Sequence, residues 1–259
     1  MTGRNVLRFS VVDFLNARPL IWGLLQDPPA GVEISRDLPS VCADKLASGE
    51  ADVGLIPSIE YQRIPGLRVV PGLGIAAASE VRSVLLVSKV SREKIRSVGL
   101  DPASRTAAVL TRLLLKRRYG IEPVYRETAS GTDASLVIGD PALKTRLNGQ
   151  VVLDLAAEWR AFSGHPFVFA FWAMRPGIPA EEVERLVRDS YAAGRREFSR
   201  LIAKEAADSG FSEPVIEDYL RHSLHFELDP GDLAGLDLFY RLAAEDGLIP
   251  PARPLQVAP

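Results

Sequence analysis

Residues 11–20 read VVDFLNARPL, a hydrophobic run that ends in an amide, a guanidinium and a proline. The run is rich in β-branched and aromatic side chains and is bounded by polar ones, which is typical of a strand. Pro19 suits the first turn of a helix, because the N–H group that proline lacks has no intrahelical partner there. This stretch therefore predicts a strand, a short polar loop and the start of a helix.

The same alternation continues over the first 70 residues. VEISRDLPS predicts a strand and a turn, SVCADKLASGEAD a helix, and ADVGLIPS a buried strand that ends in Pro-Ser. Alternating strands and helices indicate an α/β fold, and we expect a mainly parallel sheet. Ligands in such folds bind beyond the carboxyl ends of the strands. Asn16 and Ser58 both follow predicted strands, so we expect them to share one site.

The composition excludes several classes of function. The chain has 259 residues, 47% of them hydrophobic and 25% charged, with a formal net charge of -2. This balance favours a globular protein and gives no indication of a nucleic acid or an anionic membrane as partner. One cysteine and three histidines are too few for a cysteine-rich or histidine-based metal site. The N-terminal stretch shows no signal-peptide pattern, and we expect a cytoplasmic location.

Beyond residue 70, a second α/β segment is followed by a helical return. RTAAVLTRLLLKRRYG is the clearest helix, and FVFAFWAMRP suits a buried strand that crosses back to the first segment. We expect two lobes around a cleft. Residues 1–84 together with 173–259 would form the first lobe, and residues 85–172 the second.

Two polar clusters are candidate anchors for a small anion. Asn16 and Arg18 offer hydrogen-bond donors, but polar loop residues are common, and the alternative is that Asn16 ends a strand and Arg18 is a solvated side chain. Ser104, Arg105 and Thr106 open the long helix, where free N–H groups, the helix dipole and two hydroxyls favour an anion. Ordinary capping by Ser104 or Asp101 is the alternative.

The remaining candidates lie at other strand ends. Ser58 could cap the following helix and leave its amides to face a carboxylate. Gly139 allows close approach of the backbone, and Asp140 is either a base or the cap of a helix that begins at Pro141. The sequence contains no dinucleotide-binding, P-loop, serine-hydrolase or zinc-protease motif, so nucleotide and hydride chemistry are unsupported.

Segments spread over residues 8 to 175 resemble the chorismate dehydratase family of the futalosine route to menaquinone. They read FLNARPL, DLPS, LASGEADVGLIPSIEY, VVPGLGIAA, RSVLLVSK, LDPASRTA, LVIGDPAL and PFVFAFWA. The resemblance implies a fold similar to type 2 periplasmic binding proteins, with two α/β lobes joined by two crossover strands. It also implies an enzyme that removes water from chorismate to give 3-[(1-carboxyvinyl)oxy]benzoate.

The resemblance further implies a site without metal or redox cofactor. Asn16 would act in catalysis, and the substrate would be bound by Arg18, Ser58, Ser83, Ser104, Arg105, Thr106, Gly139 and Asp140. Glu60, Asp140 and His165 are possible proton acceptors, but we favour a carboxylate of the substrate, because the best motif residues are donors. A non-catalytic protein that binds a small carboxylated anion is the alternative function.

Overall fold

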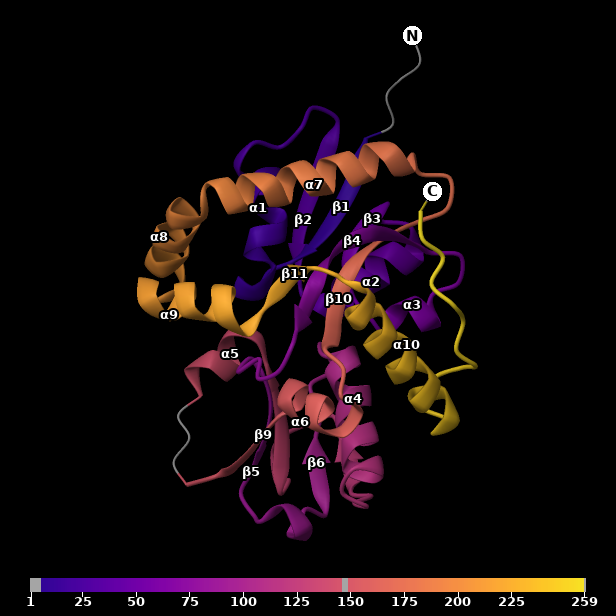
Figure 1. Ribbon diagram of the computed structural model, residues 1–259, viewed down its shortest axis with the longest axis vertical. Helices are drawn as coiled ribbons and strands as arrows, with labels where there is room; N and C mark the ends of the chain where they lie inside the picture. Colours follow the sequence, from indigo (N-terminus) through magenta and orange to yellow (C-terminus); the bar gives the residue numbers. More distant parts are fainter. Residues whose placement is uncertain (1–5, 146–148, 259) are drawn as a thin grey trace.

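The computed structural model describes residues 6–145 and 149–258. The predicted lobes also include residues 1–5, 146–148 and 259, which lie outside the described residues. The described chain forms two mixed β-sheets with helices packed around them. Figure 1 shows the first sheet in the upper half of the molecule and the second sheet in the lower half.

The first sheet has the strand order β11-β4-β10-β3-β1-β2. Strands β2, β1 and β3 are parallel, whereas β10 lies antiparallel between β3 and β4, and β11 pairs antiparallel with β4. The expectation of a mainly parallel sheet is therefore wrong, because β10 arrives from the second sheet and runs back through the first. The bounds are β1 (Leu7–Val12), β2 (Val32–Asp37), β3 (Val53–Pro57), β4 (Arg68–Ala77), β10 (Phe167–Met174) and β11 (His225–Glu227).

The second sheet has the order β7-β6-β8-β5-β9. Strand β5 is antiparallel to β8 and β9, and β6 is parallel to β7 and β8. Its strands are β5 (Val84–Ser88), β6 (Ser97–Gly99), β7 (Val124–Arg126), β8 (Ala134–Ile138) and β9 (Val151–Asp154). The predicted lobe boundaries stay a prediction. The pairing of β10 with the first sheet favours a return crossing before Phe167 rather than after residue 172.

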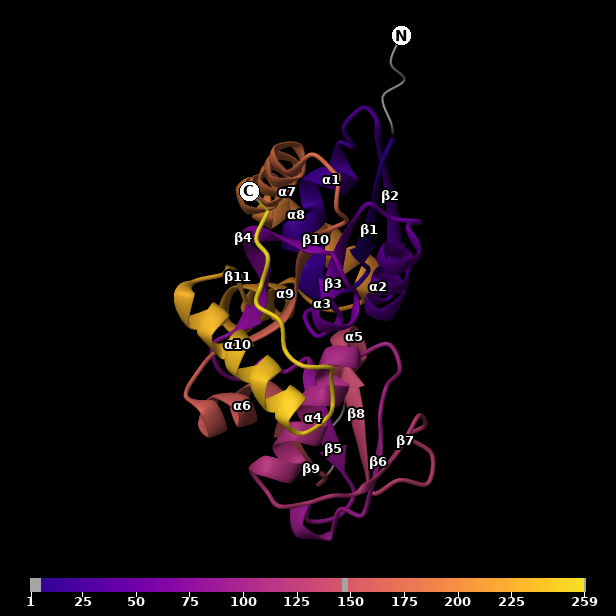
Figure 2. The same ribbon diagram turned by 90° about the vertical axis from the view of Figure 1, so that its right-hand side faces the viewer.

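Helices cover both sheets, as the two views in Figures 1 and 2 show. None of the described helices is long and apolar enough to cross a membrane. The helices are α1 (Arg18–Gln26), α2 (Pro39–Ser48), α3 (Glu60–Arg63), α4 (Arg105–Arg117), α5 (Gly139–Lys144), α6 (Leu155–Ser163), α7 (Ala180–Arg196), α8 (Phe198–Ser209), α9 (Glu213–Asp218) and α10 (Pro230–Glu245), with the short turns η1 (Leu15–Ala17), η2 (Arg92–Lys94) and η3 (Tyr219–Ser223).

Helices α1 and α7 pack closely, and this contact fixes the first turns of α1. A Cβ atom on Gly194 of α7 would lie 2.3 Å from the carbonyl oxygen of Pro19, so only glycine fits there. The Ser190 hydroxyl of α7 donates to the carbonyl of Leu20 at 2.8 Å and accepts from the amide of Leu24 at 3.1 Å. The start of α1 is thereby held against the helical return of the chain.

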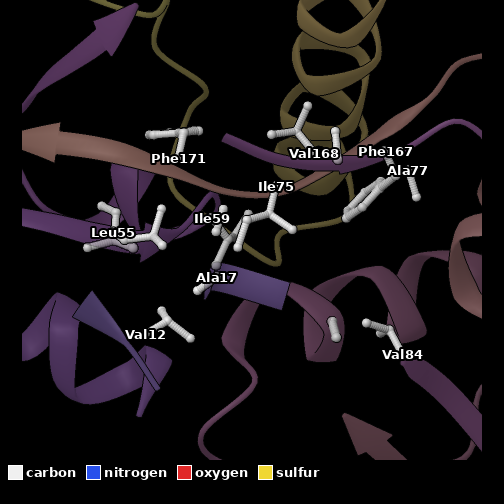
Figure 3. Close-up of a cluster of buried hydrophobic side chains, with 14 of the residues drawn as sticks. Val12, Ala17, Leu55, Ile59, Ile75, Ala77, Val84, Phe167, Val168 and Phe171 are labelled. Carbon is white, nitrogen blue, oxygen red and sulfur yellow. The ribbon is translucent and has the colours of Figure 1, made fainter. Parts of the chain in front are cut away.

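The hydrophobic core continues up to the junction of the two sheets. Figure 3 shows buried side chains from β1, β3, β4, β5 and β10 in one cluster, among them Val12, Leu55, Ile75, Val84 and Phe171. The strands are fully buried over most of these positions, so each aliphatic side chain contributes about 1.5–3 kcal/mol of transfer free energy. Val12, Ile75 and Val84 also line the cavity described next, so the core forms one wall of it.

Candidate active site

A cavity lies where β1 and β3 end and where α4 and α5 begin. It encloses about 570 Å³ of space not filled by protein atoms, part of which is open to solvent. Its lining is of the kind found at small-molecule sites, which are mostly apolar with a few placed polar groups. The wall is mainly aliphatic and aromatic, and the other residues that line it are Asn16, Ser83, Ser104, Arg105, Thr106 and Gly139.

Asn16 lies in the turn η1, directly after β1. The amide of Leu15 donates to the Asp140 carboxylate at 3.0 Å, and the amide of Ala17 donates to the carbonyl of Phe14 at 3.0 Å. These bonds fix the turn, yet the Asn16 Oδ1 atom is buried and has no hydrogen-bond partner among the described residues. A buried acceptor without a partner costs free energy, so this atom is suited to accept a hydrogen bond from a ligand.

Helix α4 begins at the cavity wall without a side-chain cap. Ser104 occupies the N-cap position with ψ of 66°, outside the extended region that capping residues usually adopt, and its hydroxyl makes no capping bond. Asp101 does not cap the helix either, because its carboxylate accepts from the amide of Ala103 at 2.9 Å. The first N–H groups of α4 have no intrahelical partner, and they leave the positive end of the helix dipole at the cavity.

Thr106 and Ser58 join α4 to the end of β3. The Thr106 hydroxyl oxygen accepts from the amide of Ile59 at 3.2 Å. Ser58 is fully buried and donates to the carbonyl of Val168 at 2.8 Å. The N-cap position of α3 is Ile59, so the expectation that Ser58 caps this helix is wrong. The structure brings Thr106 to the cavity wall, but it places Ser58 behind the wall, where it binds β10.

Both predicted arginines form ion pairs with carboxylates of the protein itself. Arg105 lines the cavity, but its guanidinium pairs with Asp44 at 2.8 Å and with Glu60 at 3.0 Å, and these hydrogen bonds raise its pKa. Arg18 is only 7% exposed and pairs with Asp13 at 2.7 Å and Glu205 at 3.0 Å. Arg18 is the first residue of α1 and is not among the described residues that line the cavity.

Gly139 and Asp140 begin α5 opposite the η1 turn. Gly139 has a φ of +63°, which favours glycine, and a Cβ atom there would be in tight contact with the ring of Phe14, at 3.1 Å. Helix α5 begins at Gly139, so Asp140 does not cap a helix that begins at Pro141. Burial raises the pKa of Asp140, although the hydrogen bond from Leu15 opposes this shift. Asp140 supports the turn that carries Asn16 and is not itself part of the described cavity wall.

Ser83 lies immediately before β5 and is fully buried at the cavity wall. Its hydroxyl accepts a hydrogen bond from the phenol of Tyr219 at 2.6 Å. Sequence reasoning missed Tyr219, because 136 residues separate the two side chains. It also missed the apolar wall residues Phe14, Phe169 and Leu224, which have the same pattern as core residues. Only the position of Phe14 between a strand end and Asn16 could have indicated a cavity.

Comparisons with known proteins agree with this architecture. A chorismate dehydratase of Thermus thermophilus is 28% identical over 234 residues, which cover 81% of this chain and 86% of that protein. A crystal structure of a protein from Archaeoglobus fulgidus superposes with a TM-score of 0.79 at 18% identity, over 96% of this chain and 100% of the other. The periplasmic aliphatic sulphonate binding protein of Escherichia coli superposes with a TM-score of 0.61 at 17% identity, over 98% and 94% of the two chains.

The structural matches confirm the predicted two-lobed fold of the periplasmic-binding-protein kind. Because their sequence identities are low, they carry the fold alone. The family is shown by a sequence model for menaquinone biosynthesis, which matches residues 7–245. That range contains both sheets and every residue of the cavity wall. The chain therefore belongs to the menaquinone biosynthesis family.

Proposed function

We propose that this protein is a chorismate dehydratase, a hydro-lyase that converts chorismate to 3-[(1-carboxyvinyl)oxy]benzoate in the futalosine route to menaquinone. The observation that carries the proposal is that one cavity joins the unpaired amide oxygen of Asn16 to the uncapped start of α4. Membership of the menaquinone biosynthesis family and the Thermus thermophilus relative named chorismate dehydratase support it.

The cavity offers separate places for the acidic and apolar parts of chorismate. Chorismate carries two carboxylates, and the first amides of α4 with the Ser104 hydroxyl would bind one of them. The guanidinium of Arg105 already faces two carboxylates, so the amides and hydroxyls supply most of the binding. The apolar wall surrounds the ring and excludes water, which strengthens each of these hydrogen bonds.

The reaction follows from the electronic structure of the substrate. The proton to be lost lies in conjugation with the ring carboxylate through a double bond, so its removal gives a delocalised carbanion. The neighbouring hydroxyl then leaves, and with the abstracted proton it forms water, while the electron pair completes the aromatic ring. Aromatisation drives the elimination, so the chemistry requires neither a redox cofactor nor a metal. The Asn16 amide would bind the departing hydroxyl, since it has both an acceptor and donors.

The proton acceptor is most simply a carboxylate of the substrate itself. Glu60 pairs with Arg63 and Arg105, and Asp140 binds the Leu15 amide. Neither of these side chains nor His165 is among the described residues of the cavity wall. The protein would then contribute orientation and a dry cavity, which together lower the barrier by restricting the reactants.

Incubation of the purified protein with chorismate, without added metal or cofactor, tests the proposal. We expect the diene absorbance to disappear and the product to be lighter by the mass of one water. Intact chorismate, together with thermal stabilisation of the protein by it, would contradict the proposal and indicate a binding protein. A location in the cytoplasm, and the absence of nucleic-acid and membrane partners, stay predictions from the sequence.

A further inference from the structure

The hydrogen bond between Tyr219 and Ser83 has a direction that the surroundings impose. Tyr219 is fully buried, with a relative exposure of 1%, and Ser83 Oγ, at 2.6 Å, is the one partner of its hydroxyl in the described chain. A buried phenol proton needs an acceptor, so Tyr219 must donate to Ser83. Burial also raises the pKa of Tyr219, which keeps the phenol protonated. The Ser83 hydroxyl oxygen is therefore an acceptor in this pair.

This direction determines what Ser83 can do at the cavity. A serine hydroxyl has one proton to donate, and Ser83 cannot use it on the phenol. No other hydrogen bond of the Ser83 hydroxyl is found in the described part of the chain. Since Ser83 lines the cavity, its proton is available to a ligand oxygen. Asn16 Oδ1 is an unpaired acceptor on the same wall, so the cavity has one preset donor and one preset acceptor.

The backbone before Ser83 is held in a strained conformation. Arg82 has a φ of +62°, the one positive value among the described residues other than glycine. The Asp154 carboxylate accepts from the amides of Val81 and Arg82 at 3.0 and 2.6 Å, and the Arg82 guanidinium donates to Ser223 at 2.8 Å. Such strain persists where the surroundings over-determine it, and it is concentrated at functional sites.

The other side of this arrangement is also irregular. Tyr219 and Ser223 belong to η3, which is one turn of π-helix. Turns of this kind are rare and frequent at functional sites, because they move one side chain out of the α-helical register. Here Arg82 and Ser83 both contact η3, through Ser223 and Tyr219 respectively. The strained turn and the π-helical turn thus fix the same serine from two directions.

We propose that Tyr219 is a positioning residue that sets the Ser83 hydroxyl as a hydrogen-bond donor to an anionic oxygen of the bound substrate. The inference rests on the proposed function, in which that oxygen belongs to a carboxylate of chorismate. Tyr219 itself does not reach the substrate and acts only through Ser83. Tyr219→Phe frees the Ser83 hydroxyl to rotate, while Ser83→Ala removes the donor.

A double-mutant cycle on chorismate turnover tests the inference. We expect Ser83→Ala to lower kcat/KM by about tenfold or more, mostly through a higher KM, because a hydrogen bond to a charged group is lost. Tyr219→Phe should lower kcat/KM about three- to tenfold, again through KM. In the Ser83→Ala background, Tyr219→Phe should cost nothing further. A merely structural role would instead lower the active fraction, and therefore kcat, in both backgrounds.

The controls separate the possible outcomes. Tyr61 is also fully buried, but its phenol donates to the carbonyl of Pro254 away from the cavity, at 3.0 Å. Tyr61→Phe should leave KM unchanged. If Tyr219→Phe does not fold, Ser83→Ala is compared with the double variant. Their KM values should be equal. The double variant should have the higher Tm, because Ser83→Ala leaves the buried Tyr219 phenol without an acceptor.

An unchanged KM for Tyr219→Phe would overturn the role assigned to Tyr219, and so would an additive loss in the double variant. If the wild type still turns over chorismate, the proposed function stands in either case. A wild-type protein without turnover would overturn both, through the proposed function.

Discussion

Helices α4 and α6 pack against each other, yet they begin in opposite ways. Helix α6 is capped by Asp154, whose carboxylate accepts from the amides of Ala156 and Ala157 at 3.1 Å each. Helix α4 begins at Ser104, which makes no capping bond. The first N–H groups of α6 therefore have an acceptor within the protein, whereas the first N–H groups of α4 remain as donors at the cavity.

The difference shows how one type of helix end serves either stability or binding. Asp154 is a local anion, and it neutralises both the start of α6 and the strained turn before Ser83. At α4 the corresponding anion would come from the ligand. The unpaired Asn16 oxygen on the same cavity wall indicates that this end is kept free for binding.

The largest effect is expected at Asn16. We predict that Asn16→Ala lowers kcat by about 10²- to 10³-fold, the loss typical of one preorganised polar group at a reacting centre. The Tm should not fall, because the substitution removes a buried acceptor that has no partner. Turnover and thermal unfolding of the same sample check both parts. A lower Tm with unchanged kcat would assign Asn16 to the fold instead.

The next effect concerns the stability of the capped helix. Asp154→Ala leaves four backbone N–H groups without their acceptor, and we expect the free energy of unfolding to fall by about 2–3 kcal/mol. Asp229→Ala is the matched control, because this exposed residue caps α10 with one bond, to the amide of Asp232. Its cost should be nearer 1 kcal/mol. Urea unfolding measures both, and equal costs would contradict the role assigned to Asp154.

A smaller effect is expected when α4 is given its own anion. Ser104→Asp places a carboxylate at the positive end of the helix dipole, and we expect the free energy of unfolding to rise by about 0.3–1 kcal/mol. The gain should shrink in high salt, because the charge is screened. Urea unfolding at two salt concentrations checks it. A loss of stability would mean that the start of α4 is not an anion site.

The smallest effect is the pH dependence of stability that comes from protonation of the Asp154 carboxylate. Burial raises the pKa of Asp154, and this outweighs the hydrogen bonds it accepts from backbone amides. The folded protein therefore holds this proton more tightly than the unfolded chain. The stability gained from this tighter binding of the proton is present below the unfolded pKa of about 3.9. It is lost as the pH rises through the pKa of Asp154 in the folded protein.

Relative to Asp154→Asn, the wild type should therefore gain stability between pH 7 and pH 4. Unfolding of both proteins at the two pH values isolates this residue, since all other groups are shared. A relative loss for the wild type on acidification would show that the amides lower the pKa instead.

The predicted site residues that line the cavity lie at ends of elements. Asn16 follows a strand and Ser104 precedes a helix, and both boundaries can be read from the hydrophobic pattern of a few neighbours. Arg18 and Ser58 do not line the described cavity, and their partners, Glu205 and Val168, are more than 100 residues away. No local pattern distinguishes a ligand anchor from a side chain that binds a distant part of the fold.

The cavity wall and the sheet direction escaped prediction for related reasons. Phe169 and Leu224 are apolar whether they face a core or a ligand, so their periodicity is the same in both cases. The hydrophobicity of β10 indicated a buried strand, but burial is compatible with either direction of pairing. Its antiparallel insertion depends on the return crossing from the second sheet, which is a property of the whole chain.

Binding of a substrate carboxylate by the start of α4 is the contact on which the proposed function depends most. Its most direct test is calorimetric titration of the product, 3-[(1-carboxyvinyl)oxy]benzoate, into the wild type and into Ser104→Asp, because the product binds without further reaction. We predict measurable binding by the wild type and at least a tenfold weaker affinity for the variant, about 1.4 kcal/mol, since its own carboxylate competes for the same amides. Equal affinities for folded wild-type and variant proteins would contradict the claim.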